Sequence, residues 1–201
     1  MSALVLWRHS RTEYNVERRL QGSLDIALGP AGRAQAASQA KRLAASLGLD
    51  GDARIVSSPL QRAVASAQEL AAVTGGAVTV DDAFTQRSYG VWEGLTWDEV
   101  RERWPEDHAR RMRGEDPRID GWGRGVDVAA RVGEGLRRWW SPDRVTVVVS
   151  HGSAIQLGLL DLLGLEPVSR AFGKVAHGSW HVLRQAESGA WHVEAYGHGA
   201  D

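Results

Sequence analysis

Two short runs along the chain are apolar throughout rather than alternating between apolar and polar residues. They are Ala3 to Trp7 and Val145 to Val149, and both are rich in β-branched or bulky side chains. A strand of a parallel sheet is covered on both faces, so its sequence is continuously apolar. We therefore predict two buried parallel strands, and a third, weaker strand at Arg54 to Ser57.

Helical periodicity fills the segments between these strands. Residues 31–47 carry apolar side chains at three- and four-residue spacing, which is typical of an amphipathic helix. A second helix is expected to open at Ser58-Pro59, because serine is a favoured N-cap and proline a favoured first helical residue. A third predicted helix, Ala154 to Leu163, follows the valine-rich strand directly.

Strands that alternate with helices of this length predict an α/β fold, here a three-layer α/β/α architecture with a mainly parallel sheet. The aromatic-rich segments within 179–196 predict an antiparallel hairpin at one edge of that sheet. The stretch of approximately 92–130 is rich in tryptophan, arginine and glycine, and we expect it to form a helical lid insertion. The whole chain, 1–201, is expected to be a single domain.

Composition narrows the possible functions. The 201 residues include 24 basic and 25 acidic side chains, a net charge of −1 that argues against a general nucleic-acid binder. There is no cysteine, which excludes a disulfide framework, a thiol nucleophile and a cysteine-based zinc site. Only Lys41 and Lys174 are lysine, and the arginine bias fits either codon usage or anion binding.

No signal peptide or membrane-spanning segment is recognisable, so a cytoplasmic protein without a membrane partner is expected. A metal site is not expected either. His177 and His181 are four residues apart, but the strand pattern that follows argues against a helix that would present both to one metal ion.

Chemistry is expected where two strands end. The first strand runs into Arg8-His9, and the valine-rich strand runs into His151. Ligands of open α/β sheets bind beyond the carboxyl ends of the strands, so these two histidines are expected to converge. Arg62, in the first turn of the second helix, would add an anion clamp near a helix N-terminus. The combination predicts a pocket for a dianionic phosphoryl group.

The segment Arg8 to Asn15 resembles the R-H-G-x-T-x-x-N signature of the histidine phosphatase superfamily, the phosphoglycerate-mutase-like proteins. Further matches, in the family's order, are Gln21 to Asp25, Ser57 to Ala63, Tyr89 to Thr96 and Ser150 to Gly152. Within the superfamily the chain resembles the phosphatase branch, with the glucosyl-3-phosphoglycerate phosphatases and the cobalamin-pathway phosphatases, more than the mutases.

The resemblance implies a phosphomonoesterase that hydrolyses a small phosphorylated metabolite through a phosphohistidine on His9, without metal or cofactor. Arg8, Arg62 and His151 would bind the phosphoryl oxygens and stabilise the transition state. The other implied phosphate- or substrate-binding positions are Ser10, Asn15, Gln21, Gly22 and Gly152. A homodimer is a possible assembly.

Two positions depart from the family pattern. Gln86 stands where the pattern has the proton-donating glutamate, and Ser10 replaces the glycine after the nucleophile. An amide cannot deliver a proton, and general acid catalysis typically contributes ~10²–10⁴-fold. Gln86 therefore predicts a weakened phosphatase, unless another acid, such as Glu93, Glu13 or a water, substitutes.

Two alternatives remain open: a mutase-type phosphoryl transfer, and a catalytically degenerate phosphate-binding or regulatory protein. The substrate itself is not predicted. Specificity is expected to reside in the lid, where one or two of eight candidate wall residues should contact the substrate. These candidates are Arg87, Trp92, Trp97, Trp104, Arg110, Arg111, Arg113 and Trp122.

Overall fold

A six-stranded sheet is the middle layer of the structure, a computed structural model that describes residues 2–199. The strand order is β3-β2-β4-β1-β5-β6. The strands are β1 (Ala3–Arg8), β2 (Arg54–Ser57), β3 (Val78–Val80), β4 (Val145–Ser150), β5 (Trp180–Gln185) and β6 (Trp191–His198). The strands β1 to β4 run parallel, and β5 and β6 form an antiparallel edge. The predicted mainly parallel sheet with an antiparallel edge is confirmed.

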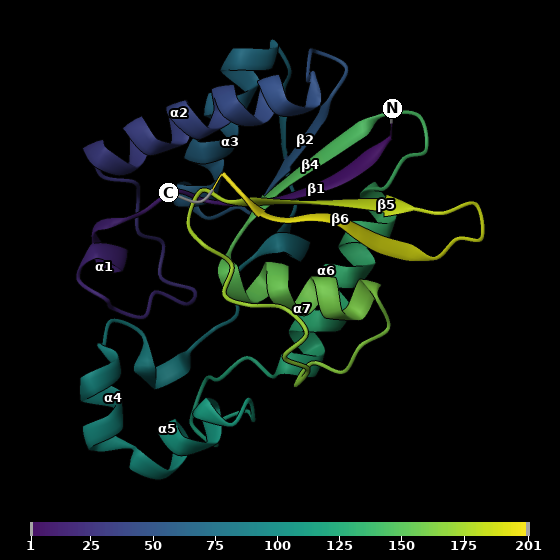
Figure 1. The fold of residues 1–201 in the computed structure, drawn as a ribbon. Coiled ribbons are helices and arrows are strands. Elements are labelled where there is room, and N and C mark those ends of the chain that lie inside the picture. The colour runs from purple at the N-terminus through teal and green to yellow at the C-terminus, as the bar shows by residue number, and fades with distance from the viewer. Residues whose placement is uncertain (1, 200–201) are drawn as a thin grey trace.

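Helices cover both faces of the sheet, with α2 and α3 on one side and α6 and α7 on the other (Figure 1). This is the predicted three-layer α/β/α architecture. The helices are α1 (Glu13–Val16), α2 (Pro30–Leu47), α3 (Gln61–Thr74), α4 (Trp97–Arg103), α5 (Pro105–Met112), α6 (Gly125–Trp139) and α7 (Gly152–Leu162). Two 3-10 turns, Asp82–Phe84 and Gly90–Trp92, lie between β3 and α4.

Alternating side chains of β1 supply both halves of the core. Leu4 and Leu6 pack in the cluster that contains α6 and α7, whereas Val5 and Trp7 pack in the cluster that contains α2 and α3. All four side chains are almost completely buried. This two-sided burial explains why the strand's sequence is apolar throughout.

The second predicted helix begins later than expected. α3 starts at Gln61, its N-cap is Leu60, and no side chain caps it. The prediction that Ser58 is the N-cap is wrong, because the Ser58 hydroxyl is used elsewhere: it hydrogen-bonds His151. Arg62 nevertheless lies in the first turn of α3, as predicted.

The elements not expected from the sequence include β3 and α6, besides the short helix α1. β3 is short and partly exposed, so it carries no buried-strand pattern. α6 contains two internal glycines, which lower helix propensity. Its residues Val128 and Val132 nevertheless pack in the core, so the last part of the expected lid range, 125–130, covers the sheet instead.

The lid is the segment between the second 3-10 turn and α6, and it contains α4 and α5. Both helices are set apart from the three layers (Figure 1). A small core of its own is formed by the buried Trp92, Val100 and Leu20. Since Leu20 follows α1, this core joins the lid to the N-terminal part of the chain.

The register of the central strands brings the predicted site residues together. Arg8 at the end of β1 pairs with Ser150 at the end of β4. The His9 N–H donates to the Ser150 carbonyl over 3.0 Å. His9 and His151 therefore leave the sheet side by side, as expected for parallel strands that end at the same edge.

Close packing of α6 against α7 depends on Gly158, which gives a testable prediction. A Cβ at this position would lie 2.3 Å from Val132 Cγ1, a branched side chain with little rotamer freedom. We expect Gly158→Val to reduce the free energy of unfolding by roughly 2 kcal/mol or more, measured by urea denaturation. Gly51→Val is the control, since the nearest atom to its added Cβ is 3.6 Å away. Equal stability losses in the two variants would contradict this account.

Candidate active site

His9 is buried at the end of β1, with only 2 % of its surface exposed. Its Nδ1 lies 2.7 Å from the Ser10 carbonyl oxygen, which can only accept a hydrogen bond. The ring proton is therefore on Nδ1, and the Nε2 lone pair is free to act as a nucleophile. Burial, together with the charges of His151, Arg62 and Arg8, holds the pKa of His9 well below its usual 6.5.

His151 packs against His9, with ring centroids 5.0 Å apart. Its Nε2 is 2.7 Å from the Ser58 Oγ, which also accepts a hydrogen bond from the Leu60 N–H. The Ser58 proton can therefore be donated to Nε2, which places the imidazole proton on Nδ1. Nδ1 is buried and has no partner among residues 2–199, so it can serve as a donor to an anion. Burial lowers the pKa of His151 well below its usual value.

Arg8 extends across the N-terminus of α7. Its Nη1 donates to the Val175 carbonyl and its Nη2 to His177 Nε2, each over 2.5 Å. A Cβ on Gly152 would lie 3.1 Å from the guanidinium carbon, so this glycine makes room for the arginine. Burial lowers the pKa of Arg8 to about 10, which still leaves the guanidinium charged at neutral pH.

Arg62 provides the second buried guanidinium. Its Nη1 donates to the Leu24 carbonyl over 2.6 Å, and its Nη2 donates to the Gly22 carbonyl over 2.9 Å. Gly22 has a φ of 53°, and an added Cβ would lie 2.1 Å from Glu93 Oε1, so only glycine fits there. Arg62 is thus held by backbone carbonyls, and burial lowers its pKa to about 10.

Gln86 is placed at the start of α7. Its Oε1 accepts hydrogen bonds from the Arg87 N–H over 3.0 Å and the Ala154 N–H over 3.3 Å. The amide therefore caps one of the free N–H groups of the helix. The positive end of α7 also points toward the site, which favours a bound anion.

A cavity of about 1310 Å³ opens over these groups. Of the ten predicted site residues, eight line it: Arg8, His9, Asn15, Gln21, Gly22, Arg62, Gln86 and Gly152. His151 and Ser10 do not line it. Ser10 is fully buried below the cavity, and its N–H donates to Ser66 Oγ over 3.2 Å. The prediction that Ser10 contacts the phosphate is not supported by this placement.

Asn15 and Gln21 have different surroundings. The Oδ1 of Asn15 accepts hydrogen bonds from the Thr12 N–H and hydroxyl as part of the capping box of α1. The Oε1 of Gln21 is buried and has no partner among the described residues. Both side chains lie at the cavity wall.

The cavity lining is strongly cationic. Eight basic residues line it: Arg8, Arg11, Arg18, Arg19, Arg62, Arg111, Arg170 and Lys174. No aspartate or glutamate among residues 2–199 does so. The proposed substitute acids lie elsewhere: Glu93 accepts hydrogen bonds from the Ser23 and Tyr89 N–H groups, and Glu13 packs against Gly29. The cavity therefore favours a ligand with more than one negative charge.

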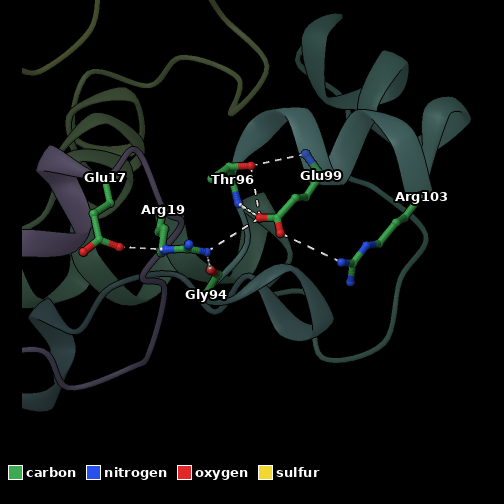
Figure 2. A network of polar contacts seen from close by, with 6 residues as sticks. All are labelled: Glu17, Arg19, Gly94, Thr96, Glu99 and Arg103. Atoms are coloured by element: carbon green, nitrogen blue, oxygen red, sulfur yellow. Dashed lines mark hydrogen bonds and ion pairs between the residues drawn. The ribbon is translucent and has the colours of Figure 1, made fainter.

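Arg19 anchors the lid to the wall of this cavity. Its guanidinium lies 2.8 Å from Glu17, 2.9 Å from the Gly94 carbonyl and 3.7 Å from Glu99 (Figure 2). Glu99 in turn forms the capping box of α4 with Thr96. The lid helix is thus held in place by a residue that also faces the cavity.

Few of the expected lid residues reach the cavity. Trp97 and Arg111 line it, and they are the two of the eight candidates that a bound substrate could reach there. Trp92 is fully buried in the core of the lid, and Arg87 forms an ion pair with Asp116 at 3.1 Å. Trp104 and Trp122 pack against the same core, and Arg110 and Arg113 form ion pairs with Glu115.

Three residues that contribute to the site were not among the site residues predicted from the sequence. His177 reaches Arg8 from a loop far along the chain, Ser58 hydrogen-bonds His151, and the Tyr89 hydroxyl bonds the Ser153 hydroxyl over 2.9 Å. Their partners are 64 to 169 residues distant in sequence, so no local pattern reveals them.

Neither a metal cluster nor a membrane span is found among residues 2–199. No three histidine, cysteine or acidic side chains gather closely enough to bind a metal ion. His181 lies in β5, where its Nδ1 accepts from the Gly197 N–H, away from His177. No described helix combines the length and the apolar character needed to cross a bilayer.

A buried histidine pair, two buried arginines and a helix N-terminus at the carboxyl edge of a parallel sheet define a phosphate-binding α/β protein. The sequence profile of the histidine phosphatase superfamily (branch 1) matches residues 4–198, and the chain belongs to this superfamily.

Several named relatives are similar over most of the chain. Glucosyl-3-phosphoglycerate phosphatase of Mycobacterium tuberculosis is 36 % identical over 200 residues, covering 94 % of this chain and 86 % of the relative. Phosphoserine phosphatase 1 of Hydrogenobacter thermophilus is 34 % identical, covering 83 % and 78 %. The structure of a mycobacterial glucosyl-3-phosphoglycerate phosphatase in complex with VO3 superposes with a TM-score of 0.84 at 34 % identity, covering all of both chains.

The buried neutral histidines give a prediction about stability and pH. Burial and the neighbouring Arg8 lower the pKa of His177 to about 2, whereas the unfolded chain takes up this proton near pH 6.5. The contribution of the neutral His177 to the free energy of unfolding is therefore fully present above pH 6.5, and it is lost as the pH falls below this value. When the pH is lowered from 7.5 to 5.5, the free energy of unfolding should decrease by about 1.4 kcal/mol less in His177→Asn than in the wild type. Urea denaturation measures this difference, and the exposed His192→Asn is the control. An unchanged pH slope in His177→Asn would contradict this account.

Proposed function

We propose that this protein is a phosphomonoesterase that forms a phosphohistidine on His9. The observation that carries the proposal is the unprotonated Nε2 of a buried histidine, placed between Arg8 and Arg62 in a cation-lined cavity. The relatives named above include two kinds of phosphatase. The reaction needs no metal in this proposal, because the charge-stabilising groups are arginines and a helix N-terminus.

In the first step, His9 Nε2 attacks phosphorus in line with the leaving oxygen. Arg8, Arg62 and the Nδ1 proton of His151 stabilise the negative charge on the equatorial oxygens. In the second step, water attacks the phosphohistidine and releases inorganic phosphate. The low pKa of His9 keeps it nucleophilic in mildly acidic solution. Positioning and charge stabilisation are the main requirements of phosphoryl transfer.

The substrate is proposed to carry a second anionic group. The cationic lining extends well beyond the phosphoryl pocket, and Arg18, Arg111 and Lys174 have no ion-pair partner among residues 2–199. Glucosyl-3-phosphoglycerate and phosphoserine, which name two of the relatives, both carry a carboxylate besides the phosphate. Phosphorylated organic acids are therefore the substrates we expect this cavity to favour.

The direct test is a phosphatase assay combined with phosphoenzyme trapping. The wild type should hydrolyse p-nitrophenyl phosphate and acquire an acid-labile label from a ³²P-labelled ester after rapid quenching. His9→Ala should lose both. A stable phosphoenzyme that passes its phosphoryl group to a second hydroxyl would instead indicate a mutase. Absence of turnover and label would indicate a protein that only binds phosphate.

Gln86→Glu should increase activity where the leaving group is poor. A glutamate at this position keeps the cap on Ala154 and adds a proton donor, so hydrolysis of alkyl phosphates should rise, by up to ~10²-fold. Aryl phosphates, whose leaving groups need little protonation, should change only a few-fold. Steady-state kinetics on a matched pair of esters measures this, and equal changes for both esters would refute the missing-acid explanation.

Arg18 provides a test of the second anionic group. It is the one non-glycine residue with a positive φ, 58°, in the described chain, and it lines the cavity. Arg18→Gly should therefore stabilise the fold by up to about 1 kcal/mol, because glycine adopts this conformation without strain. The same variant should weaken the preference for 3-phosphoglycerate over glycerol 3-phosphate roughly tenfold.

Denaturation and the ratio of kcat/KM values measure the two effects of Arg18→Gly. The control is Arg144→Gln, an exposed arginine just before β4, at the opposite end of the strand from the site. If the ratio of the kcat/KM values for the two substrates is unchanged in Arg18→Gly, Arg18 has no role in substrate recognition.

A further inference from the structure

The leaving group needs a proton, and the cavity walls hold few groups that can supply one. Gln86 has no acidic proton, and no described carboxylate lines the cavity. His177 is neutral, because its Nε2 accepts a hydrogen bond from Arg8, and a neutral imidazole is a very weak acid. Lys174 is exposed and has no hydrogen bond that would orient it. Tyr89 is the remaining candidate.

The Tyr89 hydroxyl lies next to the position of the missing acid. It is hydrogen-bonded to Ser153 Oγ over 2.9 Å, while Gln86 Oε1 accepts from the N–H of the adjacent residue, Ala154, over 3.3 Å. Both side chains therefore meet the same first turn of α7, and both line the cavity. The phenol and the side chain at position 86 thus bond to adjacent residues of α7.

Tyr89 lies close to both buried cations of the site. Its hydroxyl interacts electrostatically with the guanidinium groups of both Arg8 and Arg62. The same cations bind the phosphoryl oxygens in the proposed function, and Tyr89 lines the same cavity as His9.

Tyr89 is also held rigidly. Its backbone N–H donates to Glu93 Oε1 over 3.0 Å, and its ring packs against Trp122 with centroids 5.4 Å apart. A proton donor must be positioned within hydrogen-bond reach of the leaving oxygen, and these contacts fix the phenol in one orientation.

We propose that Tyr89 is the proton donor to the leaving group, in the role that Gln86 cannot perform; this inference rests on the phosphatase function proposed above. As the His9 Nε2–phosphorus bond forms and the phosphorus–oxygen ester bond breaks, the Tyr89 Oη–H proton moves to the leaving oxygen, and the alcohol departs. Water then attacks the phosphohistidine, and the phenolate accepts the proton that the water loses. The nitrogen–phosphorus bond breaks, and the enzyme returns to its starting state. Ser153 positions the hydroxyl during both steps.

The test is a double-variant cycle of Tyr89→Phe and Gln86→Glu, assayed on p-nitrophenyl phosphate and glycerol 3-phosphate. The measured quantity is kcat/KM, which reports the steps up to phosphoenzyme formation. Tyr89→Phe should lower kcat/KM for the alkyl ester by about 100-fold and for the aryl ester by less than about fivefold. In the Gln86→Glu background, where a carboxylic acid is available, Tyr89→Phe should have little effect on either ester.

Two controls separate catalysis from structure. Tyr14→Phe removes a phenol hydroxyl that lies outside the cavity lining and should change neither ester. Thermal denaturation of Tyr89→Phe should match the wild type, since the ring and its packing remain. Ser153→Ala keeps Tyr89 but removes its partner, and it should lower the alkyl ester rate in the same direction by a smaller factor.

Three results would overturn the inference. The first is an equal loss on both esters in Tyr89→Phe, which would indicate a structural or binding role. The second is no loss on the alkyl ester. The third is an undiminished Tyr89→Phe effect when Gln86 is Glu. A wild type that hydrolyses neither ester would instead refute the proposed phosphatase function itself.

Discussion

Two guanidinium groups are buried at the carboxyl edge of the sheet without an ion-paired carboxylate among residues 2–199, and the rest of the site follows from this constraint. Arg8 and Arg62 are held by carbonyl oxygens of Val175, Leu24 and Gly22. Backbone carbonyls satisfy the donors but do not cancel the charge, so the buried cations remain available to an anion. Burial, together with the charges of these arginines, lowers the pKa of His9, which leaves its Nε2 lone pair unprotonated. The loop that supplies two of these carbonyls needs a glycine at position 22 because Glu93 packs against it.

Much of the fold and the centre of the site are predictable from local sequence. Continuous apolar runs locate the two central strands, and the residues that follow a parallel strand must meet at one edge of the sheet. The prediction fails where a residue's partner is remote or where local propensity is weak. Ser58 looks like a helix cap in isolation, yet its hydroxyl bonds a histidine 93 residues away. α6 is hidden by its glycines, which are required by close packing of Gly133 against α7 and of Gly135 against the 3-10 turn Asp82–Phe84. No local sequence pattern identifies His177, because its place in the site depends on its hydrogen bond with Arg8, 169 residues away.

A carboxyl group at position 86 could both cap the start of α7 and donate a proton, whereas the amide of Gln86 can only cap the helix. The side-chain oxygen that caps Ala154 is present in either residue, so the start of α7 is preserved. What changes is the electrostatic field, since a glutamate would place the first negative charge among the cavity walls. With glutamine the cavity remains wholly cationic, which strengthens the attraction for anions, including the inorganic phosphate that the proposed reaction releases. In the proposed mechanism, glutamine at position 86 would thus favour retention of product and would also leave this position without a proton donor.

The contact between Arg19 and the lid has a consequence for how substrate preference can diverge. The main-chain N–H groups of Leu20 and Gly94 donate to the carbonyls of Leu95 and Leu20 over 2.8 and 2.7 Å, so the lid and the cavity wall form one continuous framework. In such a framework, the positions of the packed segments set the size of the cavity mouth, and no hinge is needed to define it. The side chains of α4 and α5 that line the cavity, Trp97, Arg111 and Met112, can therefore be exchanged to admit differently shaped ligands while the histidines and arginines stay where the sheet places them. New selectivity then requires no change to the reacting groups, which explains how one catalytic centre can be shared by proteins with many substrates.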